Sequence, residues 1–228
     1  MEAGGRAGTK RGLKGQICPE HRWVPRNWPA RTAEGVSPTD PSPPSTVPEW
    51  REFLQDYSTE FLASSYLREA EEDGRAKWLL SEAQREARWL GYEPAGEEAV
   101  HAAEARLGVR LPLSYRNFLL ASNGRSTISY AVDLLNAEQV GWFADLEPEL
   151  VEAWRSAEMG DWVELVDRCL LVSIDDGGAG NYWLLEAGSA AENGEWTAYD
   201  WWPGDGDDPE PYDGFAALVA TTREDAVK

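Results

Sequence analysis

Cysteine and histidine are scarce in this sequence of 228 residues, and their scarcity argues against several kinds of protein. The two cysteines, Cys18 and Cys169, lie far apart, which argues against a disulfide framework and for a reducing compartment. A zinc peptidase motif would need a second histidine near His101, and a zinc deaminase would need a Pro-Cys-x-x-Cys segment; neither occurs. Cys18 and His21 lack a second pair of ligands to complete a tetrahedral zinc site. We therefore predict neither a bound metal nor a cofactor.

Long apolar runs are also missing. No stretch of eighteen apolar residues occurs, and the basic N-terminus is not followed by an apolar segment long enough for a signal peptide. We therefore expect a cytoplasmic protein that does not enter a membrane.

Basic residues are few, because 21 Lys and Arg stand against 41 Asp and Glu. Residues 1–48 hold seven of the bases and four of the acids, so they carry +3 and the rest of the chain carries −23. A surface this acidic repels nucleic acid and anionic membranes, and it attracts cationic molecules. The charge predicts a basic protein partner, although acidity that serves only solubility is an alternative interpretation.

The N-terminal segment is rich in Gly, Pro, Ser, Thr and Arg. Residues 1–46 show no hydrophobic periodicity and end in the proline-rich run PTDPSPPST. Such a composition buries too little apolar surface to offset the entropy of ordering, so we predict that residues 1–46 are disordered or extended. Trp23 and Trp28 are two aromatic residues in this segment that would suit docking on the domain or on a partner.

Helical patterns follow this segment. Thr46 and Glu49 have the spacing of a capping box, and the helix that it predicts carries an aromatic-rich face. That face consists of Trp50, Phe53, Leu54, Tyr57, Phe61 and Leu62. After Gly74, a second helical stripe is predicted from Trp78 to about Leu90. We expect both stripes to pack on the protein's own core rather than to form a groove for a partner.

The segment 103–124 contains three signals that end or restart a helix. Gly108 is suited to a left-handed C-terminal position, so the helix over 97–107 is predicted to end there. Pro112 suits the first turn of a second helix, with Leu113 on its apolar face, and Asn123-Gly124 ends that helix. His101 and Glu104 lie one turn apart on the first helix, and we interpret them as a solvated helix face.

After Gly124 the pattern changes to short apolar runs separated by turns. Strands are predicted over 128–135, 140–143, 169–174, 182–185 and 195–202, with one helix beginning near Pro148 and a terminal helix bearing Phe215. The predicted fold class is α+β, in which N-terminal helices are followed by an antiparallel sheet with an inserted helix and by a terminal helix.

The order of several motifs resembles the SUKH superfamily, which includes the Smi/Knr regulators of yeast. The first motif runs from Glu104 through Leu111-Pro112 to Asn123-Gly124, the second from Ile174 to Leu184, and the third begins at Phe215. The chain departs from the family at Ala179-Gly180-Asn181, where a charged residue is common. The chain is thus predicted to have three regions: a tail over 1–46, a helical extension over 47–91 and, from the resemblance, a SUKH-like α+β domain over 92–228.

The resemblance also implies a function. Bacterial members of the superfamily are mostly regarded as immunity proteins that bind and block toxin domains, often nucleases or deaminases. The expected activity is therefore non-enzymatic binding of a basic toxin domain. A regulatory scaffold that binds an endogenous protein is the alternative, and the residues themselves disfavour a metal-dependent enzyme.

Acidic turns with neighbouring tryptophans are the candidate binding site, because tryptophan and carboxylates together suit an interface with a cationic protein. The residues are Asp175, Asp176, Trp201, Trp202, Asp205, Asp207, Asp208 and Glu210. Side chains alternate along a strand, so one of Trp201 and Trp202 is expected to point inward and the other outward. A calcium loop would need a distal glutamate in register, which the aspartates around Asp205 lack, so we interpret them as solvated acidic loops.

Overall fold

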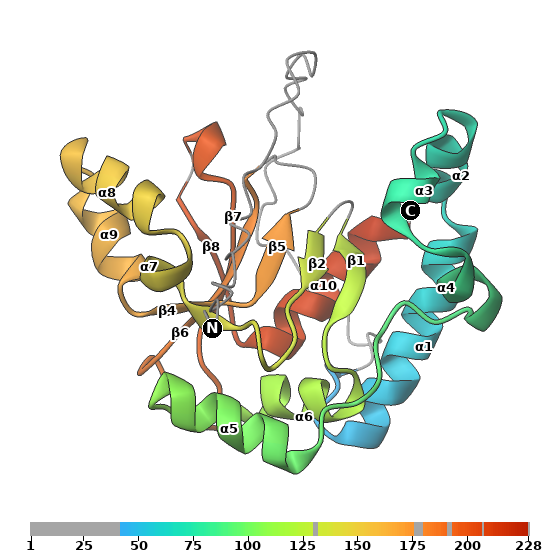
Figure 1. Ribbon diagram of the computed structural model, residues 1–228, viewed down its shortest axis with the longest axis horizontal. Coiled ribbons are helices and arrows are strands. Elements are labelled where there is room, and N and C mark those ends of the chain that lie inside the picture. Colours follow the sequence, from blue (N-terminus) through green and yellow to red (C-terminus); the bar gives the residue numbers. More distant parts are fainter. Residues whose placement is uncertain (1–41, 130–131, 176–179, 191–192, 207, 228) are drawn as a thin grey trace, which may run out of the picture. The chain divides into compact units, whose positions relative to one another are not determined.

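The computed structural model describes residues 42–129, 132–175, 180–190, 193–206 and 208–227 (Figure 1). The segment predicted to be disordered, residues 1–46, lies outside these ranges except for residues 42–46. Ten α-helices and two antiparallel sheets are found in the described residues. The predicted α+β class is confirmed.

Helix α1 (Val47–Ala63) begins where the capping box predicts. Thr46 Oγ1 accepts a hydrogen bond from Glu49 N, and the Glu49 carboxylate accepts one from Thr46 N at 3.0 Å. These bonds satisfy two of the N–H groups that a helix leaves unpaired at its first turn. The aromatic face of α1 is buried, as predicted, through Trp50, Tyr57 and Phe61.

The second predicted stripe, from Trp78 to about Leu90, is wrong as a single helix. Two short helices cover this region, α3 (Ala76–Leu79) and α4 (Glu82–Ala87), and α2 (Ser65–Glu72) precedes it. Leu80 is extended, and Ser81 starts a new helix through a capping box with Gln84. Trp78 consequently faces solvent, with 78% of its surface exposed, instead of packing on the core.

Helices α5 (Glu97–Leu107) and α6 (Leu113–Ala121) confirm the predicted punctuation. Gly108 ends α5 at φ 73°, a left-handed conformation that glycine adopts without steric cost. Pro112 is the N-terminal cap of α6, whose buried face includes Tyr115, Phe118 and Leu119. Leu113 was predicted on that face, but it is 56% exposed, because it occupies the first position of the helix on the solvent side.

The strands form two sheets. One has the order β1-β2-β5, from β1 (Arg125–Ser129), β2 (Val132–Leu134) and β5 (Ser173–Asp175). The other has the order β3-β4-β6-β7-β8, and its bounds are β3 (Gly141–Trp142), β4 (Cys169–Leu171), β6 (Tyr182–Glu186), β7 (Ala198–Trp201) and β8 (Glu210–Tyr212). All neighbouring strands within the described residues are antiparallel.

Two strand predictions are corrected by this topology. The strand predicted over 128–135 is two strands of a hairpin, and β1 starts three residues earlier, at Arg125. The strand predicted over 169–174 is divided between the sheets at Val172. Its N–H donates to Trp183 O at 3.0 Å in one sheet, and its carbonyl accepts from Leu135 N at 2.9 Å beside the other. The predicted central position holds for β4, which lies between β3 and β6.

The five-stranded sheet is covered on both faces (Figure 1). Helices α7 (Phe143–Leu146), α8 (Pro148–Ser156) and α9 (Gly160–Val166) pack on the face that bears Leu184 and Trp201. Helix α10 (Phe215–Ala226) packs with the other face, which bears Trp183 and Leu185. The insertion therefore has three helices where one was predicted, and residue 143, predicted in a strand, starts α7.

Phe215 links the N-terminal helices to the rest of the core. Its ring centroid lies 4.8 Å from that of Tyr115, 5.1 Å from that of Phe118 and 5.7 Å from that of Trp50. The first residue of α10, the second helix of the Leu-Pro motif and the aromatic face of α1 thus share one hydrophobic cluster.

Candidate partner-binding surface

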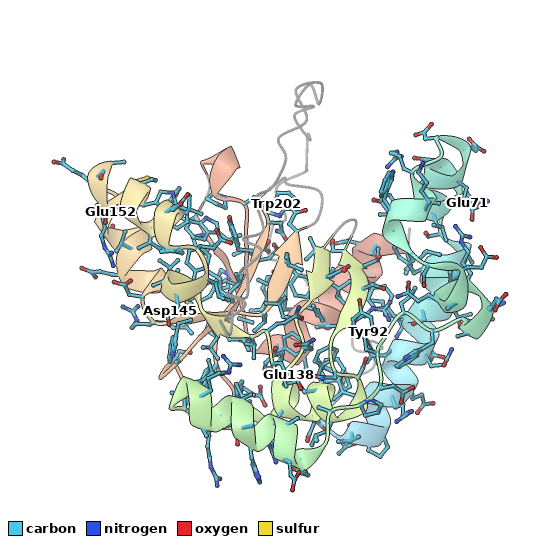
Figure 2. All side chains as sticks on the ribbon, viewed as in Figure 1. Glu71, Tyr92, Glu138, Asp145, Glu152 and Trp202 are labelled. Carbon is cyan, nitrogen blue, oxygen red and sulfur yellow. The ribbon has the colours of Figure 1, made fainter. Side chains whose placement is uncertain are left out.

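The tandem tryptophans at the end of β7 separate as the alternation of a strand requires. Trp201 is 1% exposed and packs against Trp154 and Trp162, with ring centroids 5.0 and 4.9 Å away. It is a core residue, so its predicted role in contacting a partner is corrected. Trp202 follows the strand and is half-buried (labelled in Figure 2).

The acidic loop between β7 and β8 is anchored to helix α9. It begins with a 3-10 turn over Pro203–Asp205, and the exposed Asp208 accepts a hydrogen bond from Trp162 Nε1 at 3.1 Å. Because the Trp162 ring also packs edge-on against Trp201, the loop is tied to the aromatic core of the α7–α9 side. Asp207, Asp176 and the side chain of Asp205 lie outside the described residues.

Asp175 and Glu210 lie at a different place, around two residues that the sequence did not single out. Asn181 N donates to Asp175 Oδ2 at 3.2 Å, and Asn181 Nδ2 donates to Asp200 Oδ1 at 2.5 Å. Glu210 of β8 is the register partner of Asp200 on β7. Four of the predicted residues therefore form two groups: Trp201 and Asp208 contact Trp162 of α9, whereas Asp175 and Glu210 lie around Asn181 and Asp200.

The helices α7–α9 carry carboxylates that sequence reasoning missed. Residues 143–167 contain eight acidic residues and one base, Arg155, which pairs with Asp167 at 3.2 Å. Six of the other acids are exposed and form no ion pair with any described residue: Asp145, Glu149, Glu152, Glu158, Asp161 and Glu164. Asp145 and Glu152 lie on this side of the sheet (Figure 2). A count of charge by segment would have found this acidic surface.

Burial changes the ionisation of two acids near these groups. Desolvation raises the pKa of Asp200 to about 6, and the nearby Glu210 adds to the rise. Desolvation also raises the pKa of Glu147, the residue that precedes α8. The hydroxyl of Tyr182 has its pKa raised to about 12 by burial and by the charges of Glu147 and Asp175. Negative charge is thus dense enough near Tyr182 and Asp200 to perturb the groups themselves.

The model of the SMI1 / KNR4 family (SUKH-1) matches residues 94–220, which is more than half of the chain. This protein belongs to the SUKH-1 family. The resemblance predicted from the Leu-Pro, Asn-Gly and Phe215 motifs is confirmed. A comparison with curated proteins finds no match.

The family match begins after α4 and ends within α10. The acidic surface of α7–α9, the Asn181 group and the loop anchored by Trp162 all lie inside the SUKH-1 region. Helices α1–α4 lie before it, yet α1 contributes Trp50 to the core around Phe215.

Within the described part of this SUKH-1 protein, no three His, Cys, Asp or Glu side chains form a group that could hold a metal ion. His101 and Glu104, one turn apart on α5, both approach Arg116 of α6, at 3.5 Å from its Nη2 and 3.7 Å from its Nη1. The carboxylate of Glu104 also accepts from Leu111 N at 3.2 Å. These contacts join α5, the Leu-Pro segment and α6. None of the helices in the described ranges has the length and apolar character needed to cross a membrane.

Proposed function

We propose that this SUKH-1 protein is an immunity protein, which binds a basic toxin domain and neutralises it without catalysing a reaction. The observation that carries the proposal is the exposed, unpaired acidic surface of α7–α9, taken with the acidic loop that Trp162 holds beside it. Family membership supports a binding role, because many SUKH proteins are regarded as immunity proteins.

The charge of this surface fits a nuclease or deaminase that must itself hold an anionic nucleic acid. Six exposed carboxylates within about twenty residues produce a strong negative field, which accelerates association with a cationic surface and is screened by salt. A protein that covers the cationic surface of such a toxin also blocks its substrate. Half-buried Trp202 would supply apolar contact area of the kind that is enriched at interface hot spots.

The test uses the purified chain and a toxin domain encoded beside it. Binding is measured by calorimetry at 50 and 300 mM salt, for the wild type and for the triple variant Glu149→Gln, Glu152→Gln, Glu164→Gln. We expect the triple variant to bind at least about tenfold more weakly at low salt, and the wild type to weaken as salt rises. Toxicity in a co-expression assay should reappear with the variant.

A matched control removes the same number of charges elsewhere. Glu69, Glu72 and Glu86 are exposed on α2 and α4 and form no ion pair with described residues. The triple change of these residues to Gln should leave affinity within about twofold. Equal losses in the two variants would show that only net charge matters, and absence of binding at 50 mM salt would exclude the proposed function for this pair.

A second candidate, a regulatory scaffold that binds an endogenous protein, is favoured by Trp78. This exposed side chain of α3, a helix that precedes the family match, lines a hollow together with Leu80 and Gln84. Changing Trp78 to Ala should leave toxin binding unchanged. If it abolishes toxin binding while the α8 and α9 variant retains it, the binding surface is on the helical extension instead.

A further inference from the structure

Asp200 lies in a row of side chains across three strands. The register of the five-stranded sheet places Trp183 of β6 opposite Asp200, and Asp200 opposite Glu210 of β8. Residues directly opposite each other in an antiparallel sheet project from the same face. The row therefore runs from the buried Trp183 through the half-buried Asp200 to the exposed Glu210. Glu210 thus places an exposed carboxylate on the strand beside Asp200.

The side-chain amide of Asn181 lies beside Asp200, and only its N–H side forms a hydrogen bond. Its side chain is buried, with 1% exposed, and its Nδ2 donates to Asp200 Oδ1 at 2.5 Å. Its Oδ1, on the same terminal amide, accepts no hydrogen bond from any described residue. A buried amide oxygen without a donor is costly, by an amount comparable to a lost hydrogen bond. This amide oxygen lies beside the Asp200 carboxylate. The two groups together present hydrogen-bond acceptors, so a ligand that binds here must supply hydrogen-bond donors.

We propose that the partner places one arginine side chain beside Asn181 and Asp200, where the guanidinium donates to Asn181 Oδ1 and to the carboxylate of Asp200. The inference rests on the proposed function, because it assigns a recognition element to the same partner. A guanidinium presents several N–H donors in one plane, which matches two neighbouring acceptors better than an ammonium does. Glu210, exposed at the entrance, adds negative charge that draws the side chain in.

The state of Asp200 agrees with this role. Its pKa of about 6 reflects burial, which raises the pKa by more than the hydrogen bonds to the carboxylate lower it, and the positive charge of an arginine would compensate for the desolvation. Trp183 Nε1 faces the same carboxylate but makes no hydrogen bond of normal geometry with the described residues. The indole N–H lowers the pKa of Asp200, but by less than desolvation raises it. Carboxyl groups with perturbed pKa values are found preferentially at functional sites.

The first experiment needs no toxin. The full chain, labelled with ¹⁵N, is titrated with L-argininamide at pH 7.5, and the side-chain amide of Asn181 and the indole N–H of Trp183 are followed by NMR. Sodium chloride at the same ionic strength is the reference. We expect saturable shifts at both groups in the wild type and in Glu69→Gln, an exposed residue of α2 outside both the acidic surface and this site. In Asp200→Asn the apparent affinity should fall at least about tenfold.

Asp200→Asn keeps an acceptor for Asn181 while removing the charge, so it tests charge recognition rather than folding, and thermal unfolding confirms that the variant is folded. Saturable shifts with calcium chloride and none with argininamide would overturn the proposal in favour of a metal site. Equal shifts in the wild type and Asp200→Asn would overturn it as well.

With the toxin domain as ligand, Asp200→Asn should lose at least about tenfold in affinity. Tight toxin binding that Asp200→Asn leaves unchanged would refute the arginine site and leave the immunity function standing.

Discussion

Glu195 caps helix α6 from the opposite half of the chain. Its carboxylate accepts a hydrogen bond from Ser114 N at 2.9 Å and another from Ser114 Oγ at 2.5 Å. Pro112, the N-terminal cap residue of α6, makes no side-chain hydrogen bond of its own. The carboxylate therefore satisfies an N–H group that the first turn of the helix leaves unpaired, and its charge is favourable at the positive end of the helix dipole. The segment before β7 is thereby fixed to the Leu-Pro motif.

Replacing Glu195 with Ala should destabilise the protein by about 1 kcal/mol, the usual cost of losing a capping side chain. The free energy of unfolding is measured by urea denaturation. Glu69→Ala on the exposed side of α2 is the control, because the Glu69 side chain forms no hydrogen bond or ion pair with the described residues. This change should alter stability by less than about 0.5 kcal/mol. Equal effects of the two changes would mean that the cap contributes nothing.

The ion pair between Arg223 of α10 and Glu60 of α1 is bidentate. Arg223 Nε and Nη2 donate to the two carboxylate oxygens at 2.7 and 2.6 Å, and the guanidinium lies 4.7 Å from the centre of the Phe53 ring. Lysine cannot reproduce two parallel bonds, so Arg223→Lys should cost about 1 kcal/mol. The comparison is Arg155→Lys. The side chains of Arg155 and Asp167 are both about half exposed, so their ion pair should contribute almost nothing to stability. Thermal unfolding of the two variants should rank them in that order; the reverse order would contradict the assignment.

Much of the helical half was predictable, because its signals are local. The capping box at Thr46, the left-handed Gly108 and the restart at Pro112 each depend on residues within one turn. The sheets were predicted less well. Val172 interrupts an apolar run without any turn residue, since the break comes from its two hydrogen bonds to different sheets. Alternation predicted that Trp201 and Trp202 point apart, but only the packing of Trp201 on Trp154 and Trp162 determines which one is buried.

The candidate site was also predicted only in part, because some of its residues are brought together by contacts that are distant in the sequence. The acidic loop and Asp175 were found from composition, whereas Asp200 is a lone aspartate between aromatic residues in the sequence. Its importance arises from Asn181, nineteen residues away, and from the strand register that brings Glu210 opposite it. No local pattern contains these relationships. The acids of α7–α9 were visible in the sequence, but α9 itself was not predicted.

Asp200 should make stability depend on pH. Its pKa rises from 3.8 to about 6 on folding, so its contribution to stability is fully present below pH 3.8 and is lost as the pH rises through about 6. Asp200→Asn should therefore be more stable than the wild type at pH 7.5, by about 1–3 kcal/mol, and the difference should shrink towards zero near pH 4. Asn181, Trp183 and Glu210 face this group, and all three are unchanged in the variant. Urea denaturation at both pH values gives the comparison, and a difference that does not change with pH would contradict the prediction.

Arg125 is a buried cation in the first sheet, with no exposed surface. Its Nη1 donates to Ser58 Oγ at 2.9 Å and its guanidinium lies 4.4 Å from the centre of the Tyr57 ring, whereas Nε and Nη2 have no hydrogen-bond partner among the described residues. Desolvation lowers its pKa to about 10. We therefore expect the buried volume of the Arg125 side chain to contribute more to the stability of the protein than its charge does.

Arg125→Met keeps most of the buried volume and removes the incompletely paired charge, so it should change the free energy of unfolding by no more than about 1 kcal/mol in either direction. Arg125→Ala removes the same charge and leaves a cavity between α1 and β1, which should cost about 3 kcal/mol or more. Both are measured by urea denaturation at pH 7.5. If Met is as destabilising as Ala, the guanidinium holds α1 on β1 through its charge and its bond to Ser58, and the packing account of this residue is wrong.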